Sequence, residues 1–209
     1  MSEINYTQMN LAHCPQVAQL LEICFPDMPD HDQYGLEELQ EMARRFPEGT
    51  VLALDNESVV GMGTGIFVDI EFDGLTTERN LIAQNGEQIS NPHGSYYYGS
   101  DMAVHSDYRG RGIAREIYNR RKALVVDCNK KGFVAAATLP GFADHKDQLD
   151  IKTYLAKVVD KELFDPTLSV QLRNGFRFIR PIHRFYEYPQ SDHWAALIIW
   201  DNPEYEVTI

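Results

Sequence analysis

An arginine- and glycine-rich turn offers the clearest chemistry in this sequence. It runs from Tyr108 to Ala114, between an apolar segment that predicts a strand (96–104) and an amphipathic segment that begins at Ile113. Amide N–H groups at the start of a helix have no partner within the helix, and the helix dipole adds partial positive charge there. Glycine allows an anion to approach these amides, and the arginines add formal charge. The turn is therefore predicted to bind a phosphate or pyrophosphate.

The spacing of the glycines decides between nucleotide-binding motifs. A P-loop needs a lysine followed by serine or threonine after its second glycine, and none is present. A dinucleotide fingerprint needs a third glycine where this chain has Arg115. The pattern that fits is R/Q-x-x-G-x-G/A, filled by Arg109, Gly112 and Ala114. With Met-Ala-Val-His at 102–105 upstream, the segment resembles the coenzyme-A-binding motif of the GNAT superfamily of N-acetyltransferases.

A second resemblance lies downstream. The segment 164–176, Phe-Asp-Pro-Thr-Leu-Ser-Val-Gln-Leu-Arg-Asn-Gly-Phe, resembles the last motif of a GNAT branch that is often fused to a carbon–nitrogen hydrolase (nitrilase-like) domain. The segment 98–125 is similar to that branch as well, and together the resemblance covers about residues 50–203. We expect no hydrolase domain within these 209 residues, so the function of the fusion proteins is not carried over.

The resemblance implies a fold and a cosubstrate. The fold is α/β (α+β), with a mixed, mostly antiparallel twisted sheet whose splayed central strands are flanked by helices. Acetyl-CoA would lie between the strands predicted at 96–104 and 133–138, with its pantetheine arm on the backbone of the first strand and its pyrophosphate on the turn. No metal is expected. The coenzyme-binding residues implied are Met102, Ala103, Val104, Arg109, Gly110, Arg111, Gly112, Ile113 and Ala114.

Hydrophobic periodicity and turn residues predict the order β-α-α-β-β-β-α-β, an insertion, and then α-β-β. We expect a single domain over 1–209, with the insertion at about 140–166. Gly61, Gly63 and Gly65 alternate along one predicted strand, which indicates a bulge or a close backbone approach and leaves open a surface for pantetheine or substrate. The predicted strands are 4–9, 51–54, 59–70, 96–104, 133–138, 176–188 and 195–200, and the predicted helices are 12–24, 34–46, 113–130, 150–163 and 168–173.

Acetyl transfer needs a neutral amine, a stabilised thioester oxygen, and a departing thiolate that is either protonated or tolerated as an anion. Many GNAT enzymes carry a glutamate on the central strand at the position that is Tyr98 here, and the only carboxylate in this strand is Asp101. Strand alternation places these two side chains on opposite faces, but a bulge would bring them to one side. We therefore expect Asp101 and Tyr98 to be catalytic, while a local capping role for Asp101 stays open.

The position of the usual GNAT general acid, a tyrosine four residues before the final Gly-Phe pair, is Gln171. Glutamine has no titratable proton to give. His145 and Tyr154 in the insertion, and Tyr97 on the central strand, are alternatives for handling the thiolate. We expect His145 and Tyr154 to border the acceptor pocket, although the insertion would equally thicken the fold or support a homodimer.

Composition limits the partners. The net charge of −12 and the pI near 4.9 argue against nucleic-acid binding, which needs surplus lysine and arginine. An acidic surface would attract a cationic amine, and it also serves solubility. No secretory signal or membrane-spanning run is visible, and Cys14, Cys24 and Cys128 are scattered. We expect a cytoplasmic protein without a membrane partner.

Two functions remain after these steps. The first is an acyl-CoA-dependent N-acetyltransferase that moves an acetyl group to a primary amine of a small-molecule or peptide acceptor, by direct attack in a ternary complex. The alternative is a non-catalytic acyl-CoA-binding sensor or scaffold, which gains weight from Gln171 and from the missing glutamate.

Overall fold

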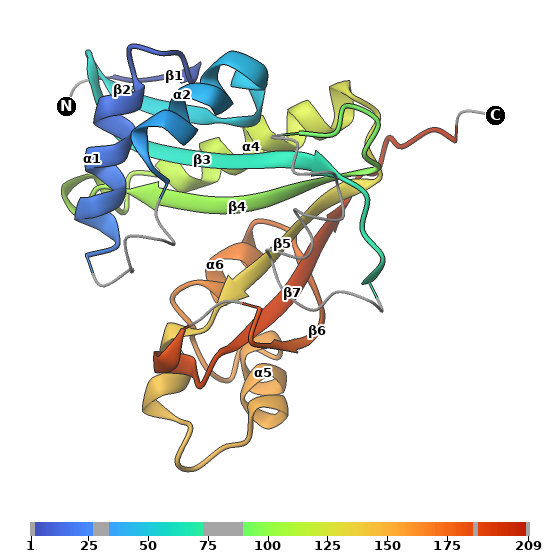
Figure 1. Ribbon diagram of the computed structural model, residues 1–209. Helices are drawn as coiled ribbons and strands as arrows, with labels where there is room; N and C mark the ends of the chain where they lie inside the picture. Colours follow the sequence, from blue (N-terminus) through green and yellow to red (C-terminus); the bar gives the residue numbers. More distant parts are fainter. Residues whose placement is uncertain (1–2, 27–33, 73–89, 186–187, 208–209) are drawn as a thin grey trace.

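The computed structural model of this chain describes residues 3–26, 34–72, 90–185 and 188–207 (Figure 1). Its strands form one sheet in the order β1-β2-β3-β4-β5-β7-β6, in which β4–β5 is the single parallel pairing of the described residues. The strands are β1 (Ile4–Gln8), β2 (Val51–Asp55), β3 (Ser58–Val68), β4 (Tyr96–Val104), β5 (Gly132–Thr138), β6 (Arg177–His183) and β7 (Trp194–Asp201). The α-helices are α1 (Cys14–Cys24), α2 (Leu36–Arg45), α4 (Ile113–Asp127), α5 (Ile151–Val159) and α6 (Leu168–Arg173).

This architecture confirms the predicted fold class and the predicted order of elements. The bounds of β4 and α6 agree with the sequence prediction, whereas α4, α5 and β6 end at least three residues before their predicted ends. A left-handed residue follows each of those early ends, and a backbone with positive φ cannot continue a regular helix or strand. These residues are Asn129 after α4 (φ 47°), Lys161 after α5 (φ 65°) and Arg184 after β6 (φ 55°).

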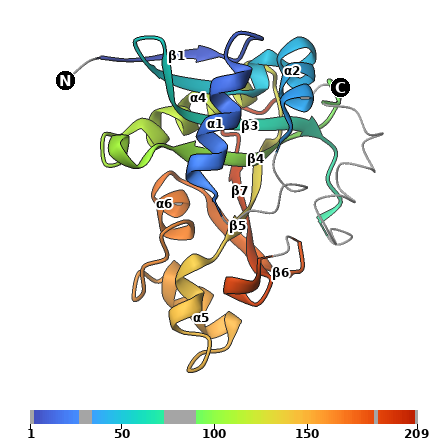
Figure 2. The same cartoon turned by 60° about the vertical axis from the view of Figure 1, so that its left-hand side comes forward.

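Helices cover both faces of the sheet. Figure 2 shows α1 in front of β3 and β4, with α2 beside it, while α4 lies on the other face. Alternation along the strands explains this arrangement, because neighbouring residues point to opposite faces. Leu52, Met62 and Ala103 pack with the α1–α2 side, and Ala53 and Val60 pack with the α4 side.

The alternating glycines allow α4 to lie close to the sheet. A Cβ atom on Gly63 would lie 2.6 Å from Ile117 Cγ2, and one on Gly61 would lie 3.1 Å from Ile113 Cγ2. A Cβ atom on Gly99 of β4 would lie 2.3 Å from Arg121 Nη2. The prediction of a close approach is confirmed. Its suggested use as a surface for pantetheine or substrate is wrong for Gly61 and Gly63, because helix α4 fills that side.

Arg121 occupies the space that these glycines leave. Only 2% of it is exposed, yet its charge is well accommodated. Its Nε donates to the Tyr97 hydroxyl at 3.0 Å and its Nη2 donates to the Thr64 carbonyl. The guanidinium carbon lies 4.5 Å from the centroid of the Phe133 ring, in cation–π geometry. A buried cation with several partners fixes the separation between α4 and the sheet.

A buried carboxylate connects the segment between β5 and α6 to the core. Asp165 accepts from the Tyr154 hydroxyl at 2.8 Å and from the Gly141 amide at 3.0 Å. Its other oxygen accepts from the amides of Thr167 (2.9 Å) and Leu168 (2.8 Å), and so caps the start of α6. This network gives a physical reason for an aspartate in the 164–176 motif.

Helix α5 buries most of the face that the sequence predicted. Ile151, Tyr154, Leu155 and Val158 are buried, but Val159 is 37% exposed, so the prediction was wrong for this last residue. Val159 is the final residue of the helix, where the chain turns away from the core.

We predict that Gly99→Ala destabilises the fold more than Gly61→Ala does. The Gly99 methyl group would overlap the Arg121 guanidinium and lie 2.4 Å from the Phe133 ring, and overpacking of this kind costs about 1–3 kcal/mol. The Gly61 methyl group meets a single side-chain methyl at 3.1 Å, which can shift. Urea unfolding of the two matched variants measures the difference. Equal losses would show that Arg121 does not limit the space at Gly99.

Candidate active site

The central strands β4 and β5 separate halfway along their length (Figure 1). They pair only from Tyr96–Gly132 to Gly99–Ala135, although β4 continues to Val104 and β5 continues to Thr138. Beyond the last pair, β4 keeps β3 as its strand partner on one side. Its opposite edge over 100–104 therefore has backbone groups that an extended ligand could pair with. The predicted splaying of the central strands is confirmed.

A β-bulge lies at the point of separation. Gly63 pairs with Met102 and Gly65 pairs with Gly99, so three steps along β4 oppose two steps along β3. The extra residue lies in the pair Ser100 and Asp101, and both side chains hydrogen-bond with Tyr34 at the approach to α2. The predicted bulge is present, and it places Asp101 on the face opposite α4.

Tyr98 lies on that same face. A Cβ atom on its neighbour Gly99 would point at Arg121 of α4, so by alternation Tyr98 points the other way. Its side chain is almost fully buried and packs edge-on with the Phe185 ring at 6.3 Å. Of the two expected catalytic residues, Asp101 is thus the one with partial exposure.

The surroundings of Asp101 suit a proton acceptor. Burial raises the pKa of the Asp101 carboxyl, and the nearby Glu38 carboxylate raises it further. Hydrogen bonds from Tyr34 and Ser100, together with the charge of Arg121, offset part of that rise in pKa. The Tyr34 hydroxyl oxygen also lies 2.8 Å from Ser100 Oγ, so the three side chains form one hydrogen-bonded group. A carboxylate with a raised pKa is a stronger base than an ordinary aspartate, which is what general-base chemistry requires.

The glycines of the turn adopt the conformation that only glycine adopts at low cost. Gly110 has φ 76° and Gly112 has φ 80°, and a Cβ atom on either would meet nothing within 4 Å. The first intrahelical bond of α4 runs from the Glu116 amide to the Gly112 carbonyl at 3.1 Å. The amides of Ile113 and Ala114 consequently lie at the open helix start, while the Ile113 side chain packs in the core.

Two arginines hold their positive charge beside this helix start. Arg109 Nε donates to the Val104 carbonyl at 3.1 Å, which connects the turn to the end of β4. The Arg111 guanidinium lies 4.7 Å from the Tyr108 ring centroid and donates to the Asp107 carbonyl at 3.1 Å. His105 Nδ1 accepts from the Asp107 amide at 3.3 Å, so this histidine caps the turn.

The two residues expected to bind substrate lie within the insertion. Tyr154 is fully buried, and its hydroxyl donates to Asp165. Burial and the Asp165 carboxylate raise the pKa of Tyr154, so it stays protonated. The His145 ring lies 5.6 Å from the Tyr154 ring. Among the described residues, His145 contacts Tyr154, and Tyr154 contacts Asp165. In this part of the chain, neither side chain contacts Asp101.

Several site residues escaped the sequence analysis. Tyr34 and Glu38 reach Asp101 only through tertiary packing, and nothing in their spacing indicates this. Arg121 did leave a signal, because it interrupts the apolar series Ile113, Ile117, Val125 at a spacing of four residues on α4. An arginine on the buried stripe of a helix predicts a buried cation with specific partners.

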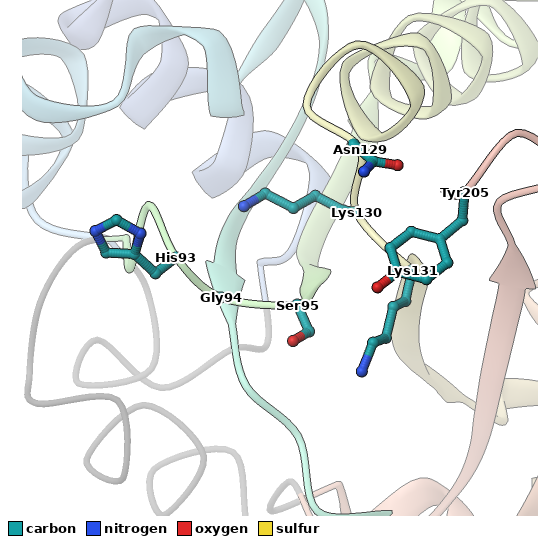
Figure 3. A pocket seen from close by; sticks show the side chains of 7 residues that line it. All are labelled: His93, Gly94, Ser95, Asn129, Lys130, Lys131 and Tyr205. Carbon is teal, nitrogen blue, oxygen red and sulfur yellow. The ribbon is translucent and has the colours of Figure 1, made fainter. Parts of the chain in front are cut away.

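Two cavities lie away from the strand separation. The first, about 170 Å³, lies where the chain enters β4 and β5, and Figure 3 shows Lys130 and Lys131 leaving the backbone in different directions there. Lys130 Nζ donates to the Pro92 carbonyl at 2.7 Å, so this lysine has a structural partner. The second cavity, about 270 Å³, lies between α1 and β3 and reaches His105 and Tyr108 of the turn.

Residues 14–141 match the family described as Acetyltransferase (GNAT) family. The chain is 28% identical over 205 residues to the uncharacterized N-acetyltransferase YkwB of Bacillus subtilis (strain 168), covering 97% of this chain and 89% of that protein. It is 27% identical over 192 residues to the probable hydrolase YhcX of the same strain, covering 91% of this chain.

The chain spans only 37% of the length of YhcX, in agreement with the resemblance to a hydrolase-fused branch. Among solved structures, the loading GNATL domain of CurA from Lyngbya majuscula superposes with a TM-score of 0.79. Its sequence identity is 13%, and the match covers 96% of this chain and 98% of that chain. At this identity the likeness concerns the fold. Within the described residues, no helix is long and apolar enough to span a membrane, and no group of three histidine, cysteine or acidic side chains could hold a metal ion.

We predict that Asp101→Asn stabilises the fold at neutral pH. The pKa of Asp101 is raised in the folded protein, so ionisation of this carboxyl destabilises the fold. The loss of stability develops as the pH rises from the usual carboxyl pKa of about 3.9 through the pKa of Asp101 in the folded protein. The neutral amide avoids that cost and can still accept from Tyr34. Thermal unfolding across the pH range should show a gain in Tm at pH 7 that vanishes in acid. A pH-independent difference would contradict the raised pKa.

Proposed function

This chain belongs to the GNAT acetyltransferase family, and we propose that it transfers an acetyl group from acetyl-CoA to the primary amine of a small-molecule or peptide acceptor. The observation that carries the proposal is the combination of three features along β4. The strand separates from β5 after Gly99, it presents Asp101 on one face, and it leads into the glycine turn before α4.

The turn and the open strand edge suit the two ends of the coenzyme. Proteins with this fold bind acyl-CoA. In our proposal the pyrophosphate lies on the amides from Gly110 to Ala114, with Arg109 and Arg111 alongside. The pantetheine arm pairs with the backbone of Met102 and Val104, which carries the thioester to the bulge. A backbone N–H of β4 then faces the thioester oxygen, and a donor in such a position is worth about 10²–10³ in rate.

Asp101 would act on the acceptor amine. A protonated amine must lose a proton before or during its attack, and Asp101 is the partly exposed carboxylate at the bulge. General-base help of this kind contributes about 10²–10⁴ in rate. The Glu38 carboxylate lies close enough to raise the pKa of Asp101, so two acidic groups meet here. This supports a cationic amine as the acceptor, in keeping with the net charge of −12.

The alternative is a sensor or scaffold that binds acyl-CoA without turnover. One observation favours it, namely that Gln171 occupies the place of the usual tyrosine acid on α6 and offers no titratable proton. The two functions differ in whether the thioester is consumed.

We predict that Gly112→Asp weakens acetyl-CoA binding much more than Gly112→Asn does. Both side chains tolerate a left-handed backbone and both enter open space, so the pair differs chiefly in charge. A carboxylate about 5 Å from a phosphate costs about 1–3 kcal/mol at an effective dielectric constant between water and protein surface, or about 10- to 100-fold in Kd. Isothermal titration calorimetry measures the Kd of acetyl-CoA for both variants. Equal affinities in two folded variants would exclude the turn as the phosphate site.

We predict that acetyl-CoA yields free thiol when amines are supplied. A panel of diamines, amino acids and peptide N-termini, read by thiol release and by mass of the acetylated product, tests this. Cationic acceptors should react best, and Asp101→Asn should lower kcat without changing the Kd of acetyl-CoA. Tight coenzyme binding with no thiol release from any amine would favour the sensor instead.

A further inference from the structure

Strand β1 forms one border of the sheet, and its outer edge is unpaired. β1 pairs with β2 from Ile4–Asp55 to Gln8–Val51 without a register shift. Figures 1 and 2 both show this strand at the outer border of the sheet. Among the described residues no strand pairs with its other side, so a row of backbone donors and acceptors points outward.

The register with β2 identifies the backbone groups that point outward. The Met9 amide donates to the Thr50 carbonyl at 3.1 Å, and these two residues lie opposite each other when the β1–β2 register is continued by one residue. In an antiparallel pair, residues that bond toward the neighbouring strand alternate with residues that face away from it. Asn5 and Thr7 therefore bond toward β2. The residues whose N–H and C=O groups face outward are Ile4, Tyr6 and Gln8.

The strand at the opposite border, β6, is protected against such pairing. Its register with β7 shifts between Phe178 and Arg180, Pro181 lies within it, and Arg177 pairs with Asp201 at 2.5 Å. Bulges, prolines and charged side chains are the features by which edge strands avoid pairing with other chains. The β1 sequence, Ile-Asn-Tyr-Thr-Gln, has no charge and no proline. β1 is therefore the edge at which this sheet can be extended.

We propose that β1 pairs antiparallel with β1 of a second copy of this chain, about a two-fold axis at Tyr6. In this register Tyr6 opposes Tyr6 of the second copy, and Ile4 opposes Gln8 of the second copy. Every outward N–H and C=O group of the strand then has a partner, and the two sheets join into one. The dimer goes beyond the proposed acetyl transfer and does not depend on it, because β1 lies three strands away from β4.

The side chains on both faces of the strand fit this two-fold pairing. Ile4 and Tyr6 pack on the α4 side of the sheet, so the two Tyr6 rings lie on the same face, opposite each other. Asn5 and Thr7 are exposed on the other face. Each Asn5 opposes Thr7 of the second copy, a polar pair that can hydrogen-bond. A two-fold interface uses the same patch twice and must be self-complementary, as this one is.

Charge also favours association at this edge. The net charge of −12 makes two copies repel each other over most of their surfaces, whereas β1 is uncharged. Continuing the register places Glu3 opposite Met9 of the second copy, so it meets no like charge. Beside the axis, the Arg120 guanidinium lies 4.9 Å from the Tyr6 ring centroid, and Glu116 pairs with Arg120 at 2.9 Å. The charges closest to the axis therefore compensate each other.

The first test measures the dimer Kd of the full chain by sedimentation equilibrium. Small interfaces are weak, so the dimer fraction should rise with protein concentration. Gln8→Pro removes an outward N–H and spares the bonds between β1 and β2. It deletes two hydrogen bonds across the axis and should raise the dimer Kd about 10-fold. Glu3→Pro, which places the same ring just before β1, is the matched control and should keep the wild-type Kd.

The second test is a disulfide across the axis, in a Cys128→Ser background that lacks the exposed native cysteine. Opposed residues of a hydrogen-bonded pair have Cα atoms about 5.5 Å apart, which a disulfide can span. Tyr6→Cys should therefore give a covalent dimer on mild oxidation. Thr7→Cys should not, because the two substituted positions lie diagonally, beyond the limit of about 7 Å.

Three results would overturn the proposal. They are a wild type that stays monomeric at every concentration, a folded Gln8→Pro protein with the wild-type dimer Kd, and equal cross-linking of Tyr6→Cys and Thr7→Cys. Should Gln8→Pro fail to fold, the two cysteine variants decide, because they leave the backbone N–H groups of β1 in place.

Discussion

The buried guanidinium of Arg121 is the contact on which the site depends. It fills the space opened by Gly63 and Gly99, and it connects α4 to the sheet through Tyr97 and Thr64. A buried charge is tolerated only when its donors are satisfied, so the arginine, the tyrosine and the glycines must occur together. The same cation lowers the pKa of Asp101 on one face and of Tyr118 on the other. One structural contact thus acts on titratable groups on both faces of the sheet.

The end of strand pairing follows from the same packing. β4 carries a bulge at Ser100–Asp101 directly after Gly99, where Arg121 and Phe133 press against the strand. A bulge bends its strand and increases the local twist. β4 therefore diverges from β5 while it stays paired with β3, and its free edge leads straight to the turn at Arg109. The proposed phosphate site and the proposed reacting centre are held at a fixed spacing by one strand.

Local patterns were enough to predict the elements and the turn, whereas the splayed strands were predicted from the family resemblance. The alternation of apolar residues gave the bounds of β4, and the glycine spacing gave the start of α4, because both depend on neighbours in sequence. Where a single left-handed residue ended an element early, as at Asn129 and Arg184, periodicity did not show it. The contacts of Tyr34 with Ser100 and Asp101 join residues far apart in the chain and required the folded structure.

The insertion shows why residue type alone misleads. Tyr154 and His145 have the chemistry of acids and ligands, and both occur close to the end of β5. Burial decides against such a use for Tyr154, since its hydroxyl is one of four donors that a buried Asp165 needs. Without those donors the carboxylate would carry an uncompensated charge in the core. The hydrogen bond that a tyrosine hydroxyl already makes, more than the residue type, decides whether its proton can be given up.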